Sequence, residues 1–306
     1  MPELPEVQTT VNGIKRYAAQ KRIISAWTDY DSAFHAGKSN IKNKKYFTNF
    51  KKEVEGKTIT NASRIGKNVL IHLSENKTII IHMKMTGHVM YGRYEKHGST
   101  WRASDPGPLR DDPFNKWIHF VLELNDGKHL VLSDLRKFAR VHVANTDSLS
   151  ADDDMGEIGP DPLDKKFTFE VFKARLMKRP SGKIKQVLLE QSIIAGIGNI
   201  YSDEMLWRAS IHPLSEPKAI PEDQLKKLYS ACKEVLTRGI DFGGDSMSDY
   251  RNILGERGKF QAEHNAYQRT GLPCRKRGCP GIISRLKVGG RSAHFCPVHQ
   301  KLFKWS

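Results

Sequence analysis

The chain has 306 residues, of which 38% are hydrophobic, so it is long enough to fold into two domains with their own cores. Its 50 lysines and arginines outnumber 34 acidic residues, which favours a polyanionic partner without distinguishing nucleic acid from a membrane surface. No apolar run reaches the roughly 20 residues of a membrane helix, and charges stand where a signal peptide would have its apolar core. We therefore expect a soluble, cytoplasmic protein with no membrane partner.

A buried helix is predicted close to the N-terminus. Apolar residues recur there at spacings of three and four, the pattern of one helical face: Leu4, Val7, Val11, Ile14 and Ala18. Farther on, β-rich runs at 68–85 and 117–135 contain short polar turns, and the Asn-Asp-Gly sequence at 125–127 is typical of a β-hairpin. Residues 1–144 are therefore predicted to form a β-sandwich with a leading helix.

The second half of the chain has a different pattern. Residues 145–164 are acidic, contain many small residues and lack periodicity, which is typical of a linker between domains. Residues 165–265 show helical spacing in several segments, and residues 266–306 contain three of the four cysteines around a predicted β-hairpin. The whole chain is thus predicted to be an α+β protein with an N-terminal sandwich, a helical domain and a C-terminal hairpin.

The first residues include a candidate nucleophile. Once Met1 is removed, the ring nitrogen of Pro2 becomes a free secondary amine, which can attack the C1′ atom of a sugar. The resulting iminium ion acidifies the C2′ protons and promotes elimination of phosphates. Glu3 lies beside this amine and can transfer protons to the opening sugar ring, while Glu6 can orient or tune the pair. The simpler alternative is that these residues only begin a helix, where proline and acidic side chains are favoured.

The string PELPEV after Met1 resembles the N-terminus of the formamidopyrimidine-DNA glycosylase family, whose nucleophile is this proline. Leu4 favours this family over the related Nei branch, which usually has glycine there. The resemblance implies a bifunctional DNA glycosylase and apurinic lyase. Such an enzyme removes oxidised purines, namely 8-oxoguanine and formamidopyrimidines, from double-stranded DNA and then performs β- and δ-elimination, also at abasic sites. An oxidised-pyrimidine glycosylase of the Nei type and a non-catalytic protein that binds damaged DNA are the alternative hypotheses.

Further motifs extend this resemblance through the N-terminal half. SRIGKNVLIHL resembles the family's lysine-bearing strand, which implies that Lys67 belongs to the catalytic set and contacts the DNA phosphate and the lesion. IIIHMKMTG implies that His82 contacts a phosphate and that Met85 fills the space left by the flipped nucleotide. DLRKFAR implies that Arg136 faces the orphaned base and that Phe138 inserts between base pairs. On pattern alone, the favoured explanation of Met85 and Phe138 is that they are core residues of strands.

The segment IKQVLLEQSIIAGIGNIYSDEMLW resembles the helix-two-turn-helix of the same family. The resemblance places Lys185 near the lesion phosphates and Asn199 at the start of a helix whose N-terminal amides bind a phosphate. It also assigns Glu6 to the DNA-binding residues and places a loop that closes over the everted base within 165–265. Without the flanking match, GIGNIY would be explained by a tight turn between helices. The implied protein is a monomer in the cytoplasm, associated with the nucleoid of a prokaryotic-type cell.

Two short ligand pairs flank the predicted hairpin: Cys274 with Cys279, and Cys296 with His299. Zinc accepts a tetrahedron of three cysteines and one histidine at such spacings, and a closed site of this kind is structural. The family usually has four cysteines, so the histidine departs from its pattern. We predict one structural zinc ion, with His294 as a competing ligand and a metal-free hairpin as the alternative.

Two further features of the sequence lie outside these motifs. Arg291 follows the glycine pair at the predicted hairpin tip and matches the family's hairpin arginine, whose implied role is insertion beside the lesion phosphates. The polar segment 94–116 is longer than the resemblance leads us to expect. The sequence assigns this segment no function.

Overall fold

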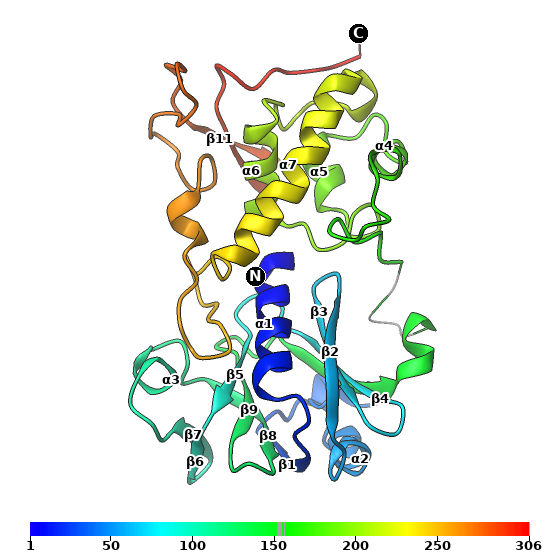
Figure 1. The fold of residues 1–306 in the computed structure, drawn as a ribbon, viewed down its shortest axis with the longest axis vertical. Helices are drawn as coiled ribbons and strands as arrows, with labels where there is room; N and C mark the ends of the chain where they lie inside the picture. The colour runs from blue at the N-terminus through cyan, green and yellow to red at the C-terminus, as the bar shows by residue number, and fades with distance from the viewer. Residues whose placement is uncertain (152–154, 156, 306) are drawn as a thin grey trace. The chain divides into compact units, whose positions relative to one another are not determined.

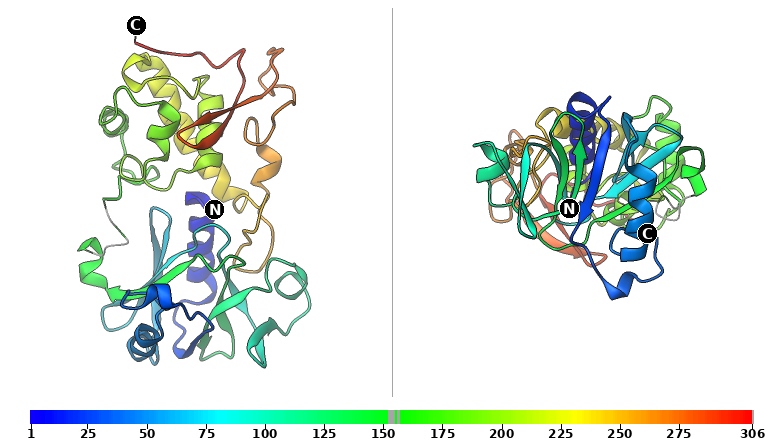
Figure 2. Two further views of the ribbon diagram at one scale, coloured as in Figure 1. Left: turned by 180° about the vertical axis from the view of Figure 1, so that it is seen from behind. Right: turned by 90° about the horizontal axis from the view of Figure 1, so that it is seen from below.

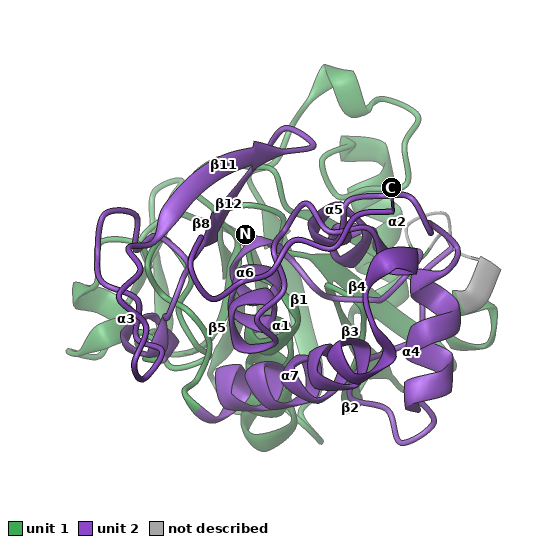
Figure 3. Ribbon diagram, turned by 90° about the horizontal axis from the view of Figure 1, so that it is seen from above, with its two compact units in different colours: residues 1–156, 242–259 green, residues 157–241, 260–306 purple. Residues whose placement is uncertain are grey.

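The structure, a computed structural model, describes residues 1–151, 155 and 157–305. It divides into two compact units, which Figure 3 shows in different colours. The N-terminal unit comprises Met1–Gly156 and Phe242–Lys259, and the C-terminal unit comprises Glu157–Asp241 and Phe260–Ser306. The predicted linker at 145–164 includes residues 152–154 and 156, which lie outside the described residues.

The N-terminal unit contains two four-stranded antiparallel sheets, as the alternating β-rich runs predict. The first has the order β1-β8-β9-β5, formed by Ile23–Thr28, Ile118–Leu124, His129–Ser133 and His88–Gly92. The second has the order β10-β4-β3-β2, formed by Arg140–Asn145, Lys77–His82, Asn68–Leu73 and Ile59–Ile65. Both sheets contribute apolar side chains to one shared core, which makes the predicted sandwich.

Two helices cover the open sides of this sandwich. Helix α1 (Leu4–Tyr17) packs against β2, β3 and β5, while α2 (Lys44–Val54) packs against β1 and β10 (Figures 1 and 2). Each helix therefore lies along one edge strand of each sheet and protects edges that would otherwise be open to pairing. The apolar face predicted for α1 is buried in the shared core through Val7, Val11 and Ile14. This packing fixes the start of α1, and with it Pro2, on the sandwich.

The polar segment 94–116 is an ordered part of the N-terminal unit. It forms a hairpin of β6 (Tyr94–His97) and β7 (Thr100–Ala103), followed by the short helix α3 (Pro108–Asp111). Its apolar side chains pack with residues of β1, β5, β8 and β9 in a second, smaller cluster. The segment thus covers the outer face of the first sheet, which explains why it is ordered despite its polar composition.

The stretch 242–259 packs with the N-terminal unit, although the predicted boundaries place it in the helical domain at 165–265. Ile253 belongs to the sandwich core and lies directly on Gly13 of α1, where an added Cβ atom would come within 2.5 Å of the Ile253 Cβ. The amide of Tyr91 also donates a hydrogen bond to the Ile253 carbonyl, at 2.8 Å. The chain therefore returns to the first unit after its longest helix, because this stretch supplies part of that unit's core.

The C-terminal unit is helical and ends in a β-hairpin, as predicted. Its helices are α4 (Phe169–Leu176), α5 (Ile184–Leu189), α6 (Asn199–Arg208) and α7 (Glu222–Asp241). Helix α6 packs against α5, α7 and strand β12, so it is the central element of this unit. The hairpin pairs β11 (Ser284–Val288) with β12 (Arg291–Phe295), and Gly289 and Gly290 form its tip with φ of 56° and 76°. Among the described helices, none combines the length and the apolar character needed to cross a bilayer.

Candidate active site, nucleic-acid interface and metal centre

Pro2 immediately precedes two buried glutamates at the start of α1. Glu3 is the N-cap residue and is 3% exposed, and Glu6 in the first helical turn is 1% exposed. One Glu6 carboxylate oxygen accepts the Glu3 amide and the other accepts the Asp245 amide, both at 2.7 Å. These bonds hold the Glu6 carboxylate in one orientation, so Glu6 is placed to orient the site. Its burial does not agree with the direct DNA contact that the resemblance implies.

A buried aspartate joins the two turns that bear Met85 and Phe138. Asp134 follows β9, is fully buried, and accepts a hydrogen bond from the hydroxyl of Thr86. Its second carboxylate oxygen accepts the Ala139 amide at 2.7 Å. The turn after β4 and the loop after β9 are therefore held together by one carboxylate, which sequence reasoning did not single out.

The side chains on these two turns are exposed. Met85 is 43% and Phe138 is 47% exposed, so neither is the strand core residue of the simpler alternative. The guanidinium carbon of Arg136 lies 4.4 Å from the centre of the Phe138 ring, a distance suited to a cation–π contact. Leu135, beside Arg136, is also 43% exposed. Adjoining exposed apolar side chains are typical of a binding surface.

A cluster of cations surrounds His82 at the end of β4. Burial, followed by the positive charges of Lys84, Lys67 and Arg140, lowers the pKa of His82 to about 3, so its imidazole is neutral at physiological pH. The Lys84 amide donates to His82 Nδ1 at 3.0 Å, which leaves the hydrogen on Nε2. Lys67 lies in the turn between β2 and β3 and is largely buried, instead of standing within a strand. The cluster offers an N–H donor among three cations, an arrangement suited to an anion such as a phosphate.

Lys185 of α5 is fully buried in the C-terminal unit. Its ammonium donates to the Asp203 carboxylate at 2.6 Å, and to the Asn199 carbonyl and the Ser202 hydroxyl, both at 2.9 Å. This position corrects the expected contact with lesion phosphates, since the ammonium has no exposed surface. Lys185 instead fixes the first turn of α6, where the phosphate-binding amides are expected.

The start of α6 matches the expected turn. Gly196 has φ of 83°, which favours glycine, and Gly198 is the N-cap residue before Asn199. The side-chain oxygen of Asn199 is buried and has no hydrogen-bond partner among the described residues. A helix N-terminus preceded by a glycine turn exposes backbone amides to an anion.

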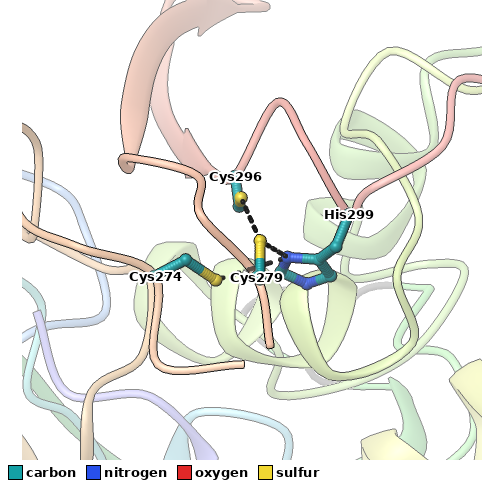
Figure 4. A group of neighbouring side chains, drawn as sticks. All are labelled: Cys274, Cys279, Cys296 and His299. Carbon is teal, nitrogen blue, oxygen red and sulfur yellow. Dashed lines mark hydrogen bonds between the residues drawn. The ribbon is translucent and has the colours of Figure 1, made fainter. Parts of the chain in front are cut away.

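The four predicted metal ligands converge beside the hairpin (Figure 4). Their ligand atoms lie within 4.8 Å of one another. Cys274 Sγ is 3.3 Å and Cys279 Sγ is 3.9 Å from His299 Nδ1, and Cys279 Sγ is 3.6 Å from Cys296 Sγ. A zinc tetrahedron requires about 3.8 Å between two sulfurs and about 3.6 Å between sulfur and nitrogen. The residues therefore fit a zinc ion.

Groups around the cluster favour ligation through these atoms. His299 Nε2 lies 3.1 Å from the Trp207 carbonyl, so it carries the hydrogen and leaves Nδ1 to bind a metal. Burial lowers the pKa of His299, which favours the neutral form that ligation requires. His294, the competing ligand, is not in the cluster, because its Nδ1 lies 2.9 Å from the Asp203 carboxylate.

Amide and indole groups also point at the sulfurs. The Gly281 amide lies 3.4 Å from Cys279 Sγ, and this contact lowers the pKa of the Cys279 thiol. The Trp207 indole nitrogen lies 3.4 Å from Cys274 Sγ. N–H groups directed at sulfur stabilise a thiolate, which is the metal-binding form. Arg291, at the other end of the same hairpin, is exposed and directly follows the tip glycines.

Known proteins resemble the chain over nearly its whole length. Residues 1–141 match the formamidopyrimidine-DNA glycosylase N-terminal domain, and residues 158–251 match the formamidopyrimidine-DNA glycosylase H2TH domain. The formamidopyrimidine-DNA glycosylase of Heliobacterium modesticaldum is 36% identical over 301 residues, covering 98% of this chain and 100% of the relative. That of Streptococcus pneumoniae strain R6 is 33% identical over 301 residues, covering 98% and 99%.

Solved structures agree with these matches. A complex of the Lactococcus lactis Fpg protein with DNA containing an abasic site has a TM-score of 0.81 and 32% identity, covering 98% of this chain and 99% of that chain. A complex of the same protein with DNA containing N7-benzyl-Fapy-dG has a TM-score of 0.80 and 33% identity, covering 98% and 100%. The shared fold defines a DNA-repair enzyme with a β-sandwich and a helix-two-turn-helix. The chain belongs to the formamidopyrimidine-DNA glycosylase family.

Proposed function

We propose that the chain is a bifunctional DNA glycosylase and apurinic lyase that removes 8-oxoguanine and formamidopyrimidines from double-stranded DNA. The observation that carries this proposal is Pro2 just before α1, beside the buried Glu3 and Glu6, with the Glu6 carboxylate held by the backbone amides of Glu3 and Asp245. The family names of the relatives support the substrate class. The proposal requires removal of Met1, because only a terminal Pro2 has a free secondary amine.

The chemistry follows from that amine. The Pro2 nitrogen forms a bond to C1′ as the glycosidic bond breaks, and the damaged base leaves with the bonding electron pair. The proton that the Pro2 nitrogen loses passes to the departing base. Glu3 donates a proton to the ring oxygen as the sugar opens, which leaves an iminium ion on Pro2. Loss of a C2′ proton then expels the 3′ phosphate, and a second elimination expels the 5′ phosphate. The products are a one-nucleotide gap and a sugar fragment that water releases from the proline.

The remaining residues bind the DNA. The cations around His82 bind a backbone phosphate. Lys67, one of these cations, also contacts the lesion. Met85 fills the space left by the flipped nucleotide, Phe138 inserts between base pairs, and Arg136 donates to the orphaned base.

Each part of the chain has its own task in this proposal. We assign catalysis to 1–144, which a linker at 145–164 joins to a DNA-binding domain at 165–265. Within that domain, the amides at the start of α6 (Asn199–Arg208) bind phosphate. A loop in the same range of residues closes over the everted base. The hairpin domain at 266–306 presents Arg291 to the phosphates beside the lesion. Cys274, Cys279, Cys296 and His299 hold one zinc ion there, which is structural because all four positions are protein ligands.

Borohydride trapping tests the proposed function directly. Reduction of the iminium ion links the protein covalently to DNA, so an adduct reports both the nucleophile and the lesion. Duplexes that contain 8-oxoguanine, thymine glycol or an abasic site should be compared. We expect adducts with 8-oxoguanine and with the abasic site. A preference for thymine glycol would indicate the Nei-type alternative, and binding without any adduct would indicate a non-catalytic protein.

Glu3→Gln should separate the two activities. We expect excision to fall by about 10²- to 10⁴-fold, because departure of the base and opening of the sugar need a proton donor. Cleavage at a preformed abasic site should change much less. Single-turnover assays on both duplexes measure this, with Glu53→Gln on the exposed surface of α2 as the control. An equal loss of both activities would assign Glu3 a structural role.

Arg291→Ala should weaken DNA binding and leave the metal site intact. We expect the slope of log affinity against log salt concentration to become shallower by about one unit, which is the contribution of one phosphate contact. Titration of a duplex at several salt concentrations measures the slope. Arg285→Ala is the matched control, since Arg285 is an exposed arginine of the same hairpin whose Nε donates to the Ser292 hydroxyl at 3.0 Å. A larger effect at Arg285 would contradict the role given to Arg291.

A further inference from the structure

A buried ion pair joins two segments of the N-terminal unit that are far apart in sequence. Arg251 is 3% exposed, and its Nε lies 2.7 Å from the Asp112 carboxylate. The guanidinium also stacks on the ring of Phe114, with 4.7 Å from its carbon to the ring centre. One buried arginine thus attaches residues 105–116, the C-terminal half of the polar segment 94–116, to the stretch 242–259.

Asn115 makes a second connection between the same segments. Its side chain is 1% exposed and donates to the Gly255 carbonyl at 2.9 Å and to the Pro108 carbonyl at 2.7 Å. Its oxygen faces His88 Nε2 at 2.9 Å, which fixes the orientation of the amide. Gly255 has φ of 78°, and an added Cβ atom would come within 2.7 Å of the Asn115 nitrogen. The two segments therefore fit closely, with no room for a side chain at this position.

The other end of the stretch reaches the catalytic site. The Asp245 amide donates to the Glu6 carboxylate at 2.7 Å, and the Tyr250 hydroxyl donates to the Glu6 carbonyl at 3.1 Å. The Ser246 hydroxyl in turn donates to the Tyr250 carbonyl at 2.7 Å. Residues 245 to 250 thus form a closed turn against Glu6.

The Arg251 side chain hydrogen-bonds to the backbone of this turn. Its Nη1 donates to the Tyr250 carbonyl at 2.8 Å and to the Ser248 carbonyl at 3.0 Å. A continuous series of contacts therefore runs from Asp112 through Arg251 and the turn to the carboxylate of Glu6. Asp112 itself touches neither Glu6 nor Glu3 in these contacts.

We propose that the segment 105–116 positions the catalytic glutamates through Asp112 and Arg251, which are positioning residues for base excision. This inference rests on the proposed function, since it takes Glu6 to orient Glu3 and Pro2. Loss of the Asp112 charge leaves a buried guanidinium without its counter-ion, so Arg251 and the attached turn must move. The Asp245 amide then leaves its position on Glu6. Small displacements of catalytic groups cost about 10²-fold in rate.

The test uses Asp112→Asn and Arg251→Gln in the full-length protein. We expect single-turnover excision at saturating 8-oxoguanine duplex to fall by about 10- to 100-fold. Affinity for a duplex with a reduced abasic site should stay within about threefold, because the two side chains are largely buried against each other, with Arg251 3% and Asp112 16% exposed. Arg251→Lys keeps the charge and should recover part of the rate. The double variant Arg110→Gln, Asp111→Asn is the matched control, since it removes an exposed ion pair beside Asp112 and should retain the wild-type rate.

A second measurement separates positioning from general destabilisation. If the effect passes through Glu6, Asp112→Asn should add little further loss in a Glu6→Gln background, whereas independent effects would multiply. Three results would overturn the positioning role. The first is that the rate losses of Asp112→Asn and Glu6→Gln multiply in the double variant. The others are unchanged excision rates in both single variants, and weaker DNA binding with an unchanged rate at saturating duplex. Wild-type protein that forms no borohydride adduct would overturn the proposed function and this inference with it. A wild-type adduct with unaffected variants would overturn the inference alone.

Discussion

Replacing Pro2 with glycine is expected to reduce excision of 8-oxoguanine by about 10³-fold or more. Glycine leaves a primary amine without the ring, so the secondary amine that forms a permanently charged iminium ion is lost. When several residues act as one catalytic unit, removal of the nucleophile alone removes most of the enzyme's rate enhancement. DNA affinity should change little, because phosphate contacts elsewhere dominate binding. Single-turnover excision and duplex titration measure the two quantities separately.

Two controls make the Pro2 result specific. Pro5→Ala changes a second buried proline in the first turn of α1, and we expect it to retain borohydride trapping. Protein that keeps Met1, identified by intact mass, should give no adduct because its Pro2 nitrogen is an amide. An undiminished adduct from such protein would show that another amine attacks the sugar.

Local patterns in the sequence predicted the elements that bury apolar faces. The spacing of Val7, Val11 and Ile14 indicated a helix, and these residues lie in the sandwich core. The β-rich runs and the Asn-Asp-Gly turn likewise indicated the strands that the structure contains. The spacing of apolar residues predicts burial correctly here, because each helix or strand packs one face against a single layer.

Exposure of single side chains could not be read from the pattern. Met85 and Phe138 lie in turns tied together by Asp134, and this contact links residues 48 positions apart. Lys185 shows the opposite case, since a lysine is usually exposed but this one is buried against Asp203, 18 positions later. In both cases a tertiary partner decides the outcome.

The stretch 242–259 shows the same limitation at larger scale. Its sequence follows α7 directly, which suggested that it belongs to the helical domain. Its contacts with Glu6 instead join residues 239 and 244 positions apart. Nothing in the local sequence indicates such a partner, and the positioning role inferred for Arg251 depends on it.

Removing the metal ligand His299 should have the second large effect. We expect about one zinc ion per chain in the purified protein, as a closed site of four protein ligands requires, and we expect His299→Ala to loosen it. Structural zinc contributes about 10–16 kcal/mol to the folding of small zinc domains, so the hairpin should lose order with the metal. Arg291 then loses its support and DNA affinity falls. Metal analysis after dialysis against a chelator, followed by duplex titration, measures both effects.

His294→Ala is the matched control for the metal ligand, because His294 lies on the same hairpin and its Nδ1 faces Asp203 instead of the sulfurs. We expect this variant to retain zinc. The two histidines therefore give opposite results if the ligand set is Cys274, Cys279, Cys296 and His299. Full zinc occupancy in His299→Ala together with loss in His294→Ala would reverse the assignment. Absence of zinc from freshly purified wild-type protein would show that contacts within the protein alone hold the four ligands together.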